Sequence, residues 1–253
     1  NKEMKIIALL PARLNSKRIY QKLLKKINKV PIILHTAYRT KLCKLIDEVI
    51  VCTDSKKIGN LIKKNNLKVI YTKKNLANGT ERISSIIHKV KADLVIDVHS
   101  DEAILNPNNI EDLINFHKKN KQFDIVVPHK KSDNSRDHNV VKIIYSKNNK
   151  ILYFTRSQAP FPFRKNKNYY FHHLDYISFK PSALRKFKKF KMSSLEEIEG
   201  IELLRALENG MSIGTFEIKT NTFSINTKKD LLLAQKKFKK DKFFKKYFEK
   251  ISI

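Results

Sequence analysis

Short apolar blocks separated by amphipathic segments organise the first half of the chain. Continuous runs of this kind predict buried strands, at 6–10, 48–53, 68–71 and 94–98. Apolar residues recur at helical spacing between the blocks, at about 31–43, 56–65 and 80–90. Asp54 and Ser55 offer a cap for the second helix. This alternation predicts an α/β protein whose mostly parallel sheet is covered by helices, a layout of the nucleotide-binding type.

The pattern changes after about residue 130. A further helix at 108–119 and a strand at 125–128 lead into a polar stretch that ends at Asn139. Strands then follow without intervening helices, at 140–145, 151–154 and 170–179, which predicts an antiparallel or mixed layer. The remaining predicted elements are helices at 182–187 and 194–208, a strand at 213–218 and a helix from 227.

The domain organisation follows from the same pattern. No internal repeat and no Pro/Gly-rich linker interrupts the 253 residues, and a single core of this size is common. We therefore predict one domain, 1–253, with a nucleotide-binding half at about 1–130. The part at about 131–253 would elaborate the same globule.

Composition narrows the cellular setting. No apolar run approaches the roughly 20 residues that a membrane-spanning helix needs, and the first residues lack the apolar region of a signal peptide. We expect no membrane insertion and a cytoplasmic location. The two cysteines, Cys43 and Cys52, have neither metal-ligand spacing nor disulfide density, and are predicted to be buried thiols.

The formal charge of +29 indicates anionic partners without identifying them. Nucleic acid, an anionic membrane surface and an acidic substrate all remain compatible with it. Lysine is spread along almost every polar face, and no recognisable nucleic-acid-binding module accompanies it. A nucleic-acid partner is therefore not expected, although a basic non-catalytic protein that binds nucleotide or nucleic acid stays an alternative.

A basic loop follows the first strand and is the first candidate for chemistry. It contains Arg13 and Arg18, with Lys22 shortly afterwards. Ligands of open α/β sheets bind outside the carboxyl ends of the strands, so these cations could neutralise a triphosphate and a leaving pyrophosphate. The loop has no glycine and matches neither common phosphate-binding motif. The alternative is a solvated basic loop in a lysine-rich protein.

Two further motifs lie where the same edge of the sheet is expected. Asn78, Gly79 and Arg82 stand at the entrance of a helix, which suits an anion or the edge of a base, or is an ordinary helix cap. Asp101 follows the strand at 94–98 and is placed to hold Mg²⁺ against nucleotide phosphates. A surface turn is the alternative for Asp101.

Together, in this order, the motifs PARLNSKRIYQK, NGTER and VIDVHSDE resemble those of the cytidylyltransferases that activate 3-deoxy-manno-octulosonate (Kdo), also called CMP-Kdo synthetases. The resemblance continues through NVVK at 139–142, YFTR at 153–156, HHL at 172–174, SLEEIE at 194–199 and INTKKDL at 225–231. It covers nearly the whole chain.

The resemblance implies a Rossmann-like sheet with a mixed-strand elaboration used for dimerisation, and an enzyme that transfers CMP from CTP to an acidic sugar with Mg²⁺. The anomeric hydroxyl would attack the α-phosphorus in line and release pyrophosphate. The resemblance further implies residues for each part of the site: Arg13, Ser16, Arg18 and Lys22 for the triphosphate; Asn78, Gly79 and Arg82 near cytidine; Asp101 for metal; Arg156, His173 and Glu202 for the sugar acid. Asn226, at the position of a family metal ligand, and Asp175, in the sugar region, are added as candidates for metal and for the sugar acid although they depart from the family pattern. Arg13, Lys22 and Asp101 would carry the catalysis.

Several positions depart from the family pattern, and they bear on the substrate. Asn226 replaces an aspartate that is a metal ligand in the family, which predicts weaker metal binding. Asp175 stands where the family has glycine, Leu203 where it has glutamine, and Ser100 and Ala103 flank Asp101 and Glu102 where the family reads GDEP. The acceptor could therefore be Kdo, a modified Kdo, a nonulosonic acid or a phosphonate, or activity could be reduced.

Overall fold

The computed structural model describes residues 4–15, 19–133, 136–164, 169–220, 223, 225 and 227–252. Its main layer is a seven-stranded sheet in the order β13-β7-β12-β6-β1-β4-β5. The strands of this sheet are β1 (Ile6–Ala12), β4 (Glu48–Thr53), β5 (Lys68–Tyr71), β6 (Leu94–Val98), β7 (Ile125–Val126), β12 (Tyr176–Phe179) and β13 (Ile213–Gly214). The strands predicted at 48–53, 68–71 and 94–98 are confirmed at those bounds.

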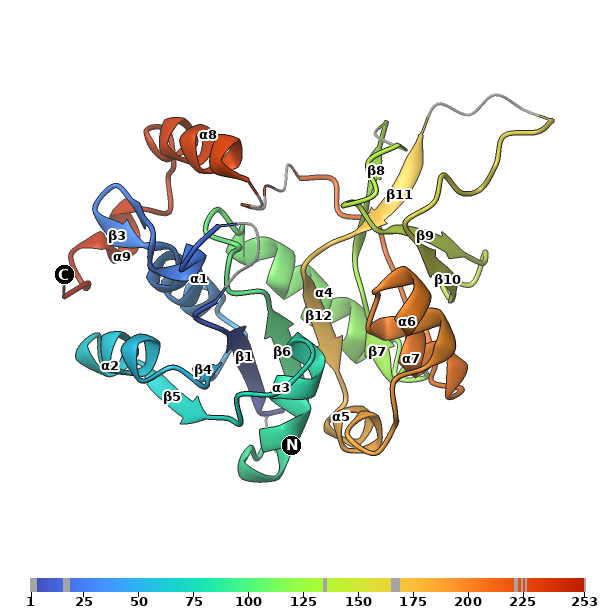
Figure 1. Ribbon diagram of the computed structural model, residues 1–253, viewed down its shortest axis with the longest axis horizontal. Coiled ribbons are helices and arrows are strands. Elements are labelled where there is room, and N and C mark those ends of the chain that lie inside the picture. The colour runs from blue at the N-terminus through green and yellow to red at the C-terminus, as the bar shows by residue number, and fades with distance from the viewer. Residues whose placement is uncertain are drawn as a thin grey trace.

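Helices cover both faces of this sheet, as predicted (Figure 1). The helices of the first part of the chain are α1 (Ile32–Lys41), α2 (Lys56–Lys64), α3 (Gly79–Ile86) and α4 (Pro107–Lys119). Ser55 caps α2 as expected, because its side chain accepts a hydrogen bond from the backbone nitrogen of Ile58 at 3.3 Å.

The two faces of β1 supply two separate hydrophobic cores. Ile6, Ala8 and Leu10 pack with α1, α2 and α4, whereas Ile7 and Leu9 pack with α3 and the helices after β12. A strand buried on both faces needs apolar residues at every position, which is what the block at 6–10 provides. β1 pairs in parallel with β4 and β6, and only β12 runs antiparallel to its neighbours β6 and β7. The predicted fold class, a mostly parallel α/β sheet, is confirmed.

A second, four-stranded antiparallel sheet stands beside the first, in the order β10-β9-β11-β8. Its strands are β8 (His129–Ser132), β9 (Lys142–Tyr145), β10 (Ile151–Thr155) and β11 (Tyr170–His173). Two sequence predictions are corrected here. The strand predicted at 170–179 is two strands, because the chain leaves the small sheet after His173 and enters the large one at Tyr176. β8 was expected to be a polar connection, but its lysines belong to an edge strand.

The helix predicted at 194–208 is also two helices, α6 (Ser194–Glu199) and α7 (Leu203–Glu208). Gly200 ends α6 in the left-handed conformation, at φ +63°, and redirects the chain. The strand predicted at 213–218 is shorter, since β13 ends at Gly214. The remaining elements are α5 (Pro181–Phe187), α8 (Lys228–Phe238), α9 (Lys245–Phe248), the hairpin β2 (Lys26–Ile27) and β3 (Val30–Pro31), and the 3-10 turns η1 (Lys22–Leu24) and η2 (Ile87–Lys89).

The C-terminal helices close the core on the α1 side. Phe238 and Tyr247 are buried there against His35, whose imidazole contacts the hydroxyl of Tyr247 at 2.7 Å. Cys43 and Cys52 are buried free thiols, as predicted. Within the described ranges, no helix has both the length and the apolar character to cross a membrane.

Candidate active site

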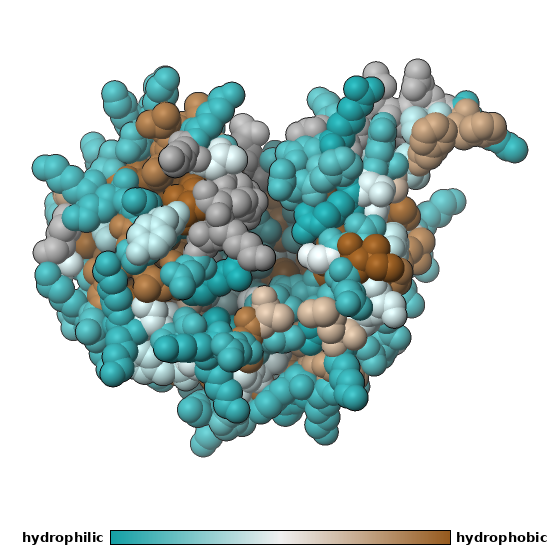
Figure 2. All heavy atoms as spheres, in the orientation of Figure 1, coloured by the Kyte–Doolittle hydropathy of each residue, from teal (hydrophilic) through white to brown (hydrophobic). Residues whose placement is uncertain are grey.

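A cleft of about 1270 Å³ opens between the two sheets, and every candidate residue that the structure describes lines it. Figure 2 shows the surface hollowed at this place. The carboxyl ends of β1 and β6, the start of α3, and the link between β11 and β12 form its walls. The residues brought together are Arg13, Lys22, Asn78, Gly79, Arg82, Asp101, Arg156, His173, Asp175 and Glu202. The candidates Ser16, Arg18 and Asn226 lie outside the described residues.

Two basic side chains occupy the end of the cleft next to β1. Arg13 is exposed, and no carboxylate among the described residues pairs with it. Lys22 is buried in η1, where its ammonium group pairs with the carboxylate of Asp101 and donates to the carbonyl oxygen of Ile225 at 2.8 Å. Lys22 therefore fastens the loop after β1 to the end of β6 and to the segment before α8, while Arg13 remains available for an anion.

The start of α3 forms the next part of the wall. The side chain of Asn78 caps the helix by accepting a hydrogen bond from the backbone nitrogen of Glu81 at 2.8 Å. Gly79 follows, and a Cβ at that position would lie 3.2 Å from Cγ of Pro11. The lack of a side chain therefore lets α3 begin close against β1, and leaves the helix N-terminus facing the cleft.

Arg82 is less free than the sequence suggested. Its guanidinium group donates to the hydroxyl of Thr72 and to the carbonyl oxygen of Lys73 at 3.3 Å, and it lies 3.7 Å from a carboxylate oxygen of Asp54. Burial lowers its pKa and the charge of Asp54 opposes that shift. Arg82 thus secures the segment after β5 while it contributes positive charge to the cleft.

The opposite end of the cleft contains Arg156 and His173. Arg156 donates from its side chain to three backbone carbonyl oxygens, those of Glu199 at 2.7 Å, His138 at 2.8 Å and Gly200 at 3.2 Å. A guanidinium group has five N–H donors, so two remain for a ligand. His173 is held by its contact with the carbonyl oxygen of Leu174 at 3.1 Å, and burial lowers its pKa.

Glu202 joins the two ends of the site. Its carboxylate accepts hydrogen bonds from the hydroxyl of Thr80 at 2.8 Å and from the backbone nitrogen of Thr80 at 3.3 Å. Burial raises the pKa of Glu202, and the hydrogen bonds from Thr80 oppose that shift. The residue before α7 is therefore fixed against the first turn of α3.

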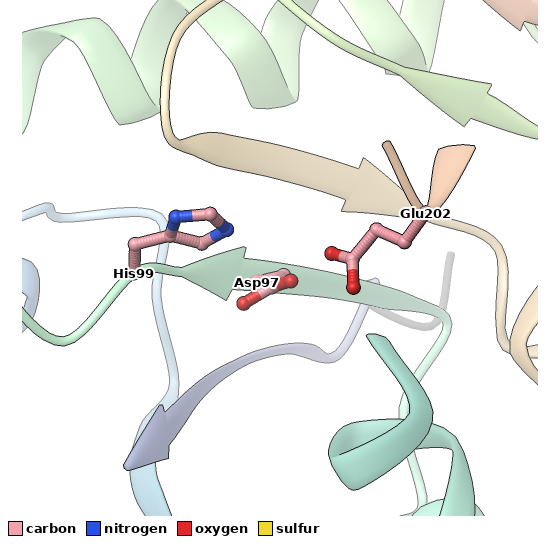
Figure 3. A group of neighbouring side chains, drawn as sticks. All are labelled: Asp97, His99 and Glu202. Atoms are coloured by element: carbon pink, nitrogen blue, oxygen red, sulfur yellow. The ribbon is translucent and has the colours of Figure 1, made fainter. Parts of the chain in front are cut away.

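Sequence reasoning missed Asp97 and His99, which lie beside Glu202 (Figure 3). Asp97 is fully buried, and burial raises its pKa to about 7. Burial by itself would lower the pKa of His99, but the carboxylates around it, Asp175 first among them, raise it to about 9. A charged residue within the apolar run Leu94–Val98 was the signal that could have identified Asp97.

A network of ion pairs around Arg205 holds together the helices that form one wall of the cleft. The guanidinium group of Arg205 donates to both carboxylate oxygens of Glu196 at 2.6 Å and to Glu81 at 2.8 Å. Arg205 and Glu196 are both buried. The network connects α6 to α3 and α7, the two helices whose starts present Asn78 and Glu202 to the cleft.

Comparison with known proteins identifies the family of the chain. The family profile described as cytidylyltransferase matches residues 7–213, and the chain belongs to that family of enzymes. Its relatives place it more closely: it is a member of the 3-deoxy-manno-octulosonate cytidylyltransferases. The enzyme of that name from Thermodesulfovibrio yellowstonii is 35% identical over 92% of this chain and 98% of its own. The one from Rickettsia prowazekii is 34% identical over 94% of this chain and 97% of its own.

A solved structure agrees with the sequence relatives. A CMP:2-keto-3-deoxy-manno-octonic acid synthetase in complex with CTP superimposes with a TM-score of 0.88, at 26% identity over 93% of this chain and 99% of that chain. The 4-diphosphocytidyl-2C-methyl-D-erythritol synthase of Anaerococcus prevotii has a TM-score of 0.63 at 15% identity, which shows a shared fold only. The predicted family and enzyme class are confirmed.

Proposed function

We propose that the enzyme transfers CMP from CTP to Kdo, or to a closely related sugar acid, and releases pyrophosphate. The names of the relatives and the CTP complex of the similar structure support both substrates. The observation that carries the proposal is the shared cleft, in which Arg13, the start of α3 and Asp101 face one another. A nucleotide, a metal ion and a sugar acid need basic, acidic and hydrogen-bonding groups in this proximity.

The triphosphate of CTP is assigned to the basic end of the cleft. Arg13 has its charge free there, and Lys22 lies beside it. Ser16 and Arg18 are assigned from the family resemblance alone. Cationic side chains around the phosphates neutralise the ground-state charge and stabilise the charge that develops on the leaving pyrophosphate.

The cytidine is assigned to the start of α3. Asn78, Gly79 and Arg82 line the cleft there, and the N-terminus of α3 offers backbone N–H groups to the edge of a base. Arg82 is anchored by Thr72 and Asp54, so it would keep its position when the nucleotide enters.

The sugar acid is assigned to the other end of the cleft. The two remaining N–H donors of Arg156 suit the carboxylate of the acid, because guanidinium and carboxylate pair in a forked geometry. His173, Asp175 and Glu202 would contact the hydroxyl groups. Asp175 replaces a family glycine, so it is the residue most suited to distinguish this acceptor from unmodified Kdo.

Mg²⁺ fits the residues present. It usually takes one or two carboxylates together with phosphate oxygens, and Asp101 presents one carboxylate to the cleft beside the basic loop. Asn226 would add a carbonyl oxygen. When bound, the ion would withdraw charge from the phosphate oxygens.

In the reaction, the anomeric oxygen of the acid bonds to the α-phosphorus and gives its proton to water, while the bond from that phosphorus to the bridging oxygen breaks. Pyrophosphate leaves with the electron pair. Arg13 and Lys22 would stabilise the leaving pyrophosphate. Arg156, paired with the carboxylate of the acid, would orient the anomeric hydroxyl for in-line attack on the phosphorus. No covalent intermediate with the protein is required.

We also propose a homodimer formed through the small sheet. Three apolar side chains on and next to it are exposed: Leu152 at 56%, Phe161 at 75% and Phe163 at 85%. The segment after β10 that carries both phenylalanines extends away from the body of the molecule (Figure 1). Light scattering should give twice the mass of the 29.7 kDa chain, and the double substitution Phe161→Ser, Phe163→Ser should reduce it to the monomer.

Incubation of the protein with CTP, Mg²⁺ and a panel of sugar acids tests the reaction. Kdo, amino-bearing Kdo derivatives, nonulosonic acids and phosphonates should be compared by pyrophosphate release and by the mass of the CMP-linked product. The proposal expects release with at least one Kdo-type acid. Release with none of them, together with salt-sensitive binding of arbitrary RNA in the absence of CTP, would favour a non-catalytic binding protein instead.

A further inference from the structure

A second group of potential metal ligands, two of which line the cleft, does not include Asp101. It consists of Asp97, His99 and Glu202, each of which offers one ligand atom within 4.8 Å of the others. Asp97 comes from inside β6, His99 follows that strand directly, and Glu202 precedes α7. Figure 3 shows the three side chains converging on one space.

Asp97 gives the strongest indication that this space binds a ligand. It is 0% exposed, and neither of its carboxylate oxygens has a hydrogen-bond partner within the described part of the chain. Buried polar groups in folded proteins are almost always satisfied, because an unpaired one costs the full desolvation penalty. A cation bound next to Asp97 would supply the partner that its two carboxylate oxygens lack.

His99 is oriented as a metal ligand. Its Nδ1 atom lies 3.4 Å from a carboxylate oxygen of Asp175. The ring extends toward the carboxylates of Asp97 and Glu202 (Figure 3), so that Nε2 is the nitrogen left for a ligand. Metal-binding histidines commonly have their second nitrogen on a carboxylate in this way, which fixes the ring and its tautomer. Asp175 would have that supporting role.

Glu202 is held in place, but its carboxylate oxygens can still accept further bonds. Its two oxygens each accept one hydrogen bond from Thr80. A carboxylate has about four lone-pair sites, so both oxygens can still bind a cation. The three side chains therefore offer two carboxylates and one imidazole, each positioned by the fold.

The donor set selects the kind of cation. Mg²⁺ and Ca²⁺ prefer oxygen ligands, whereas imidazole together with carboxylates suits Mn²⁺, Fe²⁺, Co²⁺ or Zn²⁺. A primary ammonium group is the other cation that the carboxylates could accept. A divalent metal ion would also bind the free nitrogen of His99, displacing the proton from it, whereas an ammonium group would be repelled by the protonated ring, so we favour the metal.

We propose that Asp97, His99 and Glu202 bind one divalent transition-metal ion, separately from the magnesium site at Asp101. The remaining coordination positions would face the cleft and would be filled by water or by oxygens of the sugar acid. This proposal depends neither on which acid is the acceptor nor on whether cytidylyl transfer takes place.

Titration of the metal-free protein with Mn²⁺, without CTP or acid, tests the proposal, with free Mn²⁺ followed by electron paramagnetic resonance. The wild type should bind one ion per chain. Asp97→Asn and His99→Gln should each weaken binding by about 100-fold, and Asp175→Asn by about tenfold. Asp112→Asn, at an exposed position of α4 outside the cleft, is the matched control and should bind Mn²⁺ as the wild type does. Asp101→Asn shows whether the ion belongs to the magnesium site instead. Circular dichroism checks that each variant is folded.

Two results would overturn the proposal. If Asp101→Asn loses Mn²⁺ while Asp97→Asn binds it as fully as the wild type does, the ion belongs to the magnesium site at Asp101. No binding of Mn²⁺ or Zn²⁺ by folded wild-type protein would leave the ammonium group of an amino-bearing acid as the occupant. In that case Asp97→Asn should weaken binding of the amine-bearing acid and leave the binding of Kdo unchanged. Since CTP is absent throughout, neither result affects the proposed transfer reaction.

Discussion

Lys22 and Asp101 form an ion pair across the cleft, although 79 residues separate them in the chain. The pair brings the loop after β1, which carries Arg13, to the carboxylate at the end of β6. A cation that binds triphosphate and a carboxylate that binds metal are thereby held next to each other. The pair also orients Asp101, so that substitution of this aspartate affects both the basic loop and the metal.

Asp101→Asn should reduce pyrophosphate release by about 100-fold or more at fixed Mg²⁺, because a neutral amide is a poorer ligand for a hard cation and frees Lys22 from its partner. Asp112→Asn, at an exposed position of α4 outside the cleft, is the matched control and should leave the rate unchanged. Equal rates for the two variants would remove Asp101 from the mechanism.

Asn226→Asp should lower the Mg²⁺ concentration needed for half-maximal activity. This substitution restores the carboxylate that the family resemblance places beside the ion, and a charged oxygen binds Mg²⁺ more strongly than an amide oxygen. A magnesium titration of pyrophosphate release measures the effect. An unchanged midpoint would show that residue 226 does not lie beside the ion.

Arg205→Met should lower the free energy of unfolding by about 3–5 kcal/mol, because it leaves the buried carboxylate of Glu196 without its cationic partner. Chemical denaturation measures the loss. Arg185→Met, at an exposed position of α5, is the control for the loss of an arginine and should change the stability little. A similar stability for both variants would mean that the network around Arg205 contributes nothing to the fold.

The stability should decrease in acid partly through His35. Burial lowers the pKa of His35 to about 4, from an ordinary value of 6.5. A lowered pKa means that the unfolded chain binds the proton more readily, so the contribution is complete above pH 6.5 and is lost as the pH falls toward 4. The loss amounts to about 3 kcal/mol at full protonation. His35→Gln should therefore show a flatter dependence of unfolding free energy on pH in this range, and an equally steep one would contradict the assignment.

The sequence predicted most of the large sheet because its central strands, such as β1 and β6, are buried on both faces and therefore consist largely of continuous apolar residues. It predicted the candidate site for a related reason, since the motifs directly follow β1 and β6 or open α3. The sequence alone could not show that Asp97 lies beside Glu202, because this proximity depends on how α7 packs against α3. β8 was missed because Lys130 and Lys131 give an edge strand the polarity of a loop. The break at Gly200 depends on a left-handed turn that helix periodicity does not detect.

Arg13 is the cleft residue whose removal should affect CMP transfer from CTP to a sugar acid most directly. Arg13→Ala and Arg185→Ala each remove an exposed arginine, the first inside the cleft and the second outside it. With CTP, Mg²⁺ and the best acid of the panel, Arg185→Ala should release pyrophosphate at the wild-type rate. Arg13→Ala should release it about 100-fold or more slowly while it unfolds at the same temperature. Equal rates for these two variants would contradict the account.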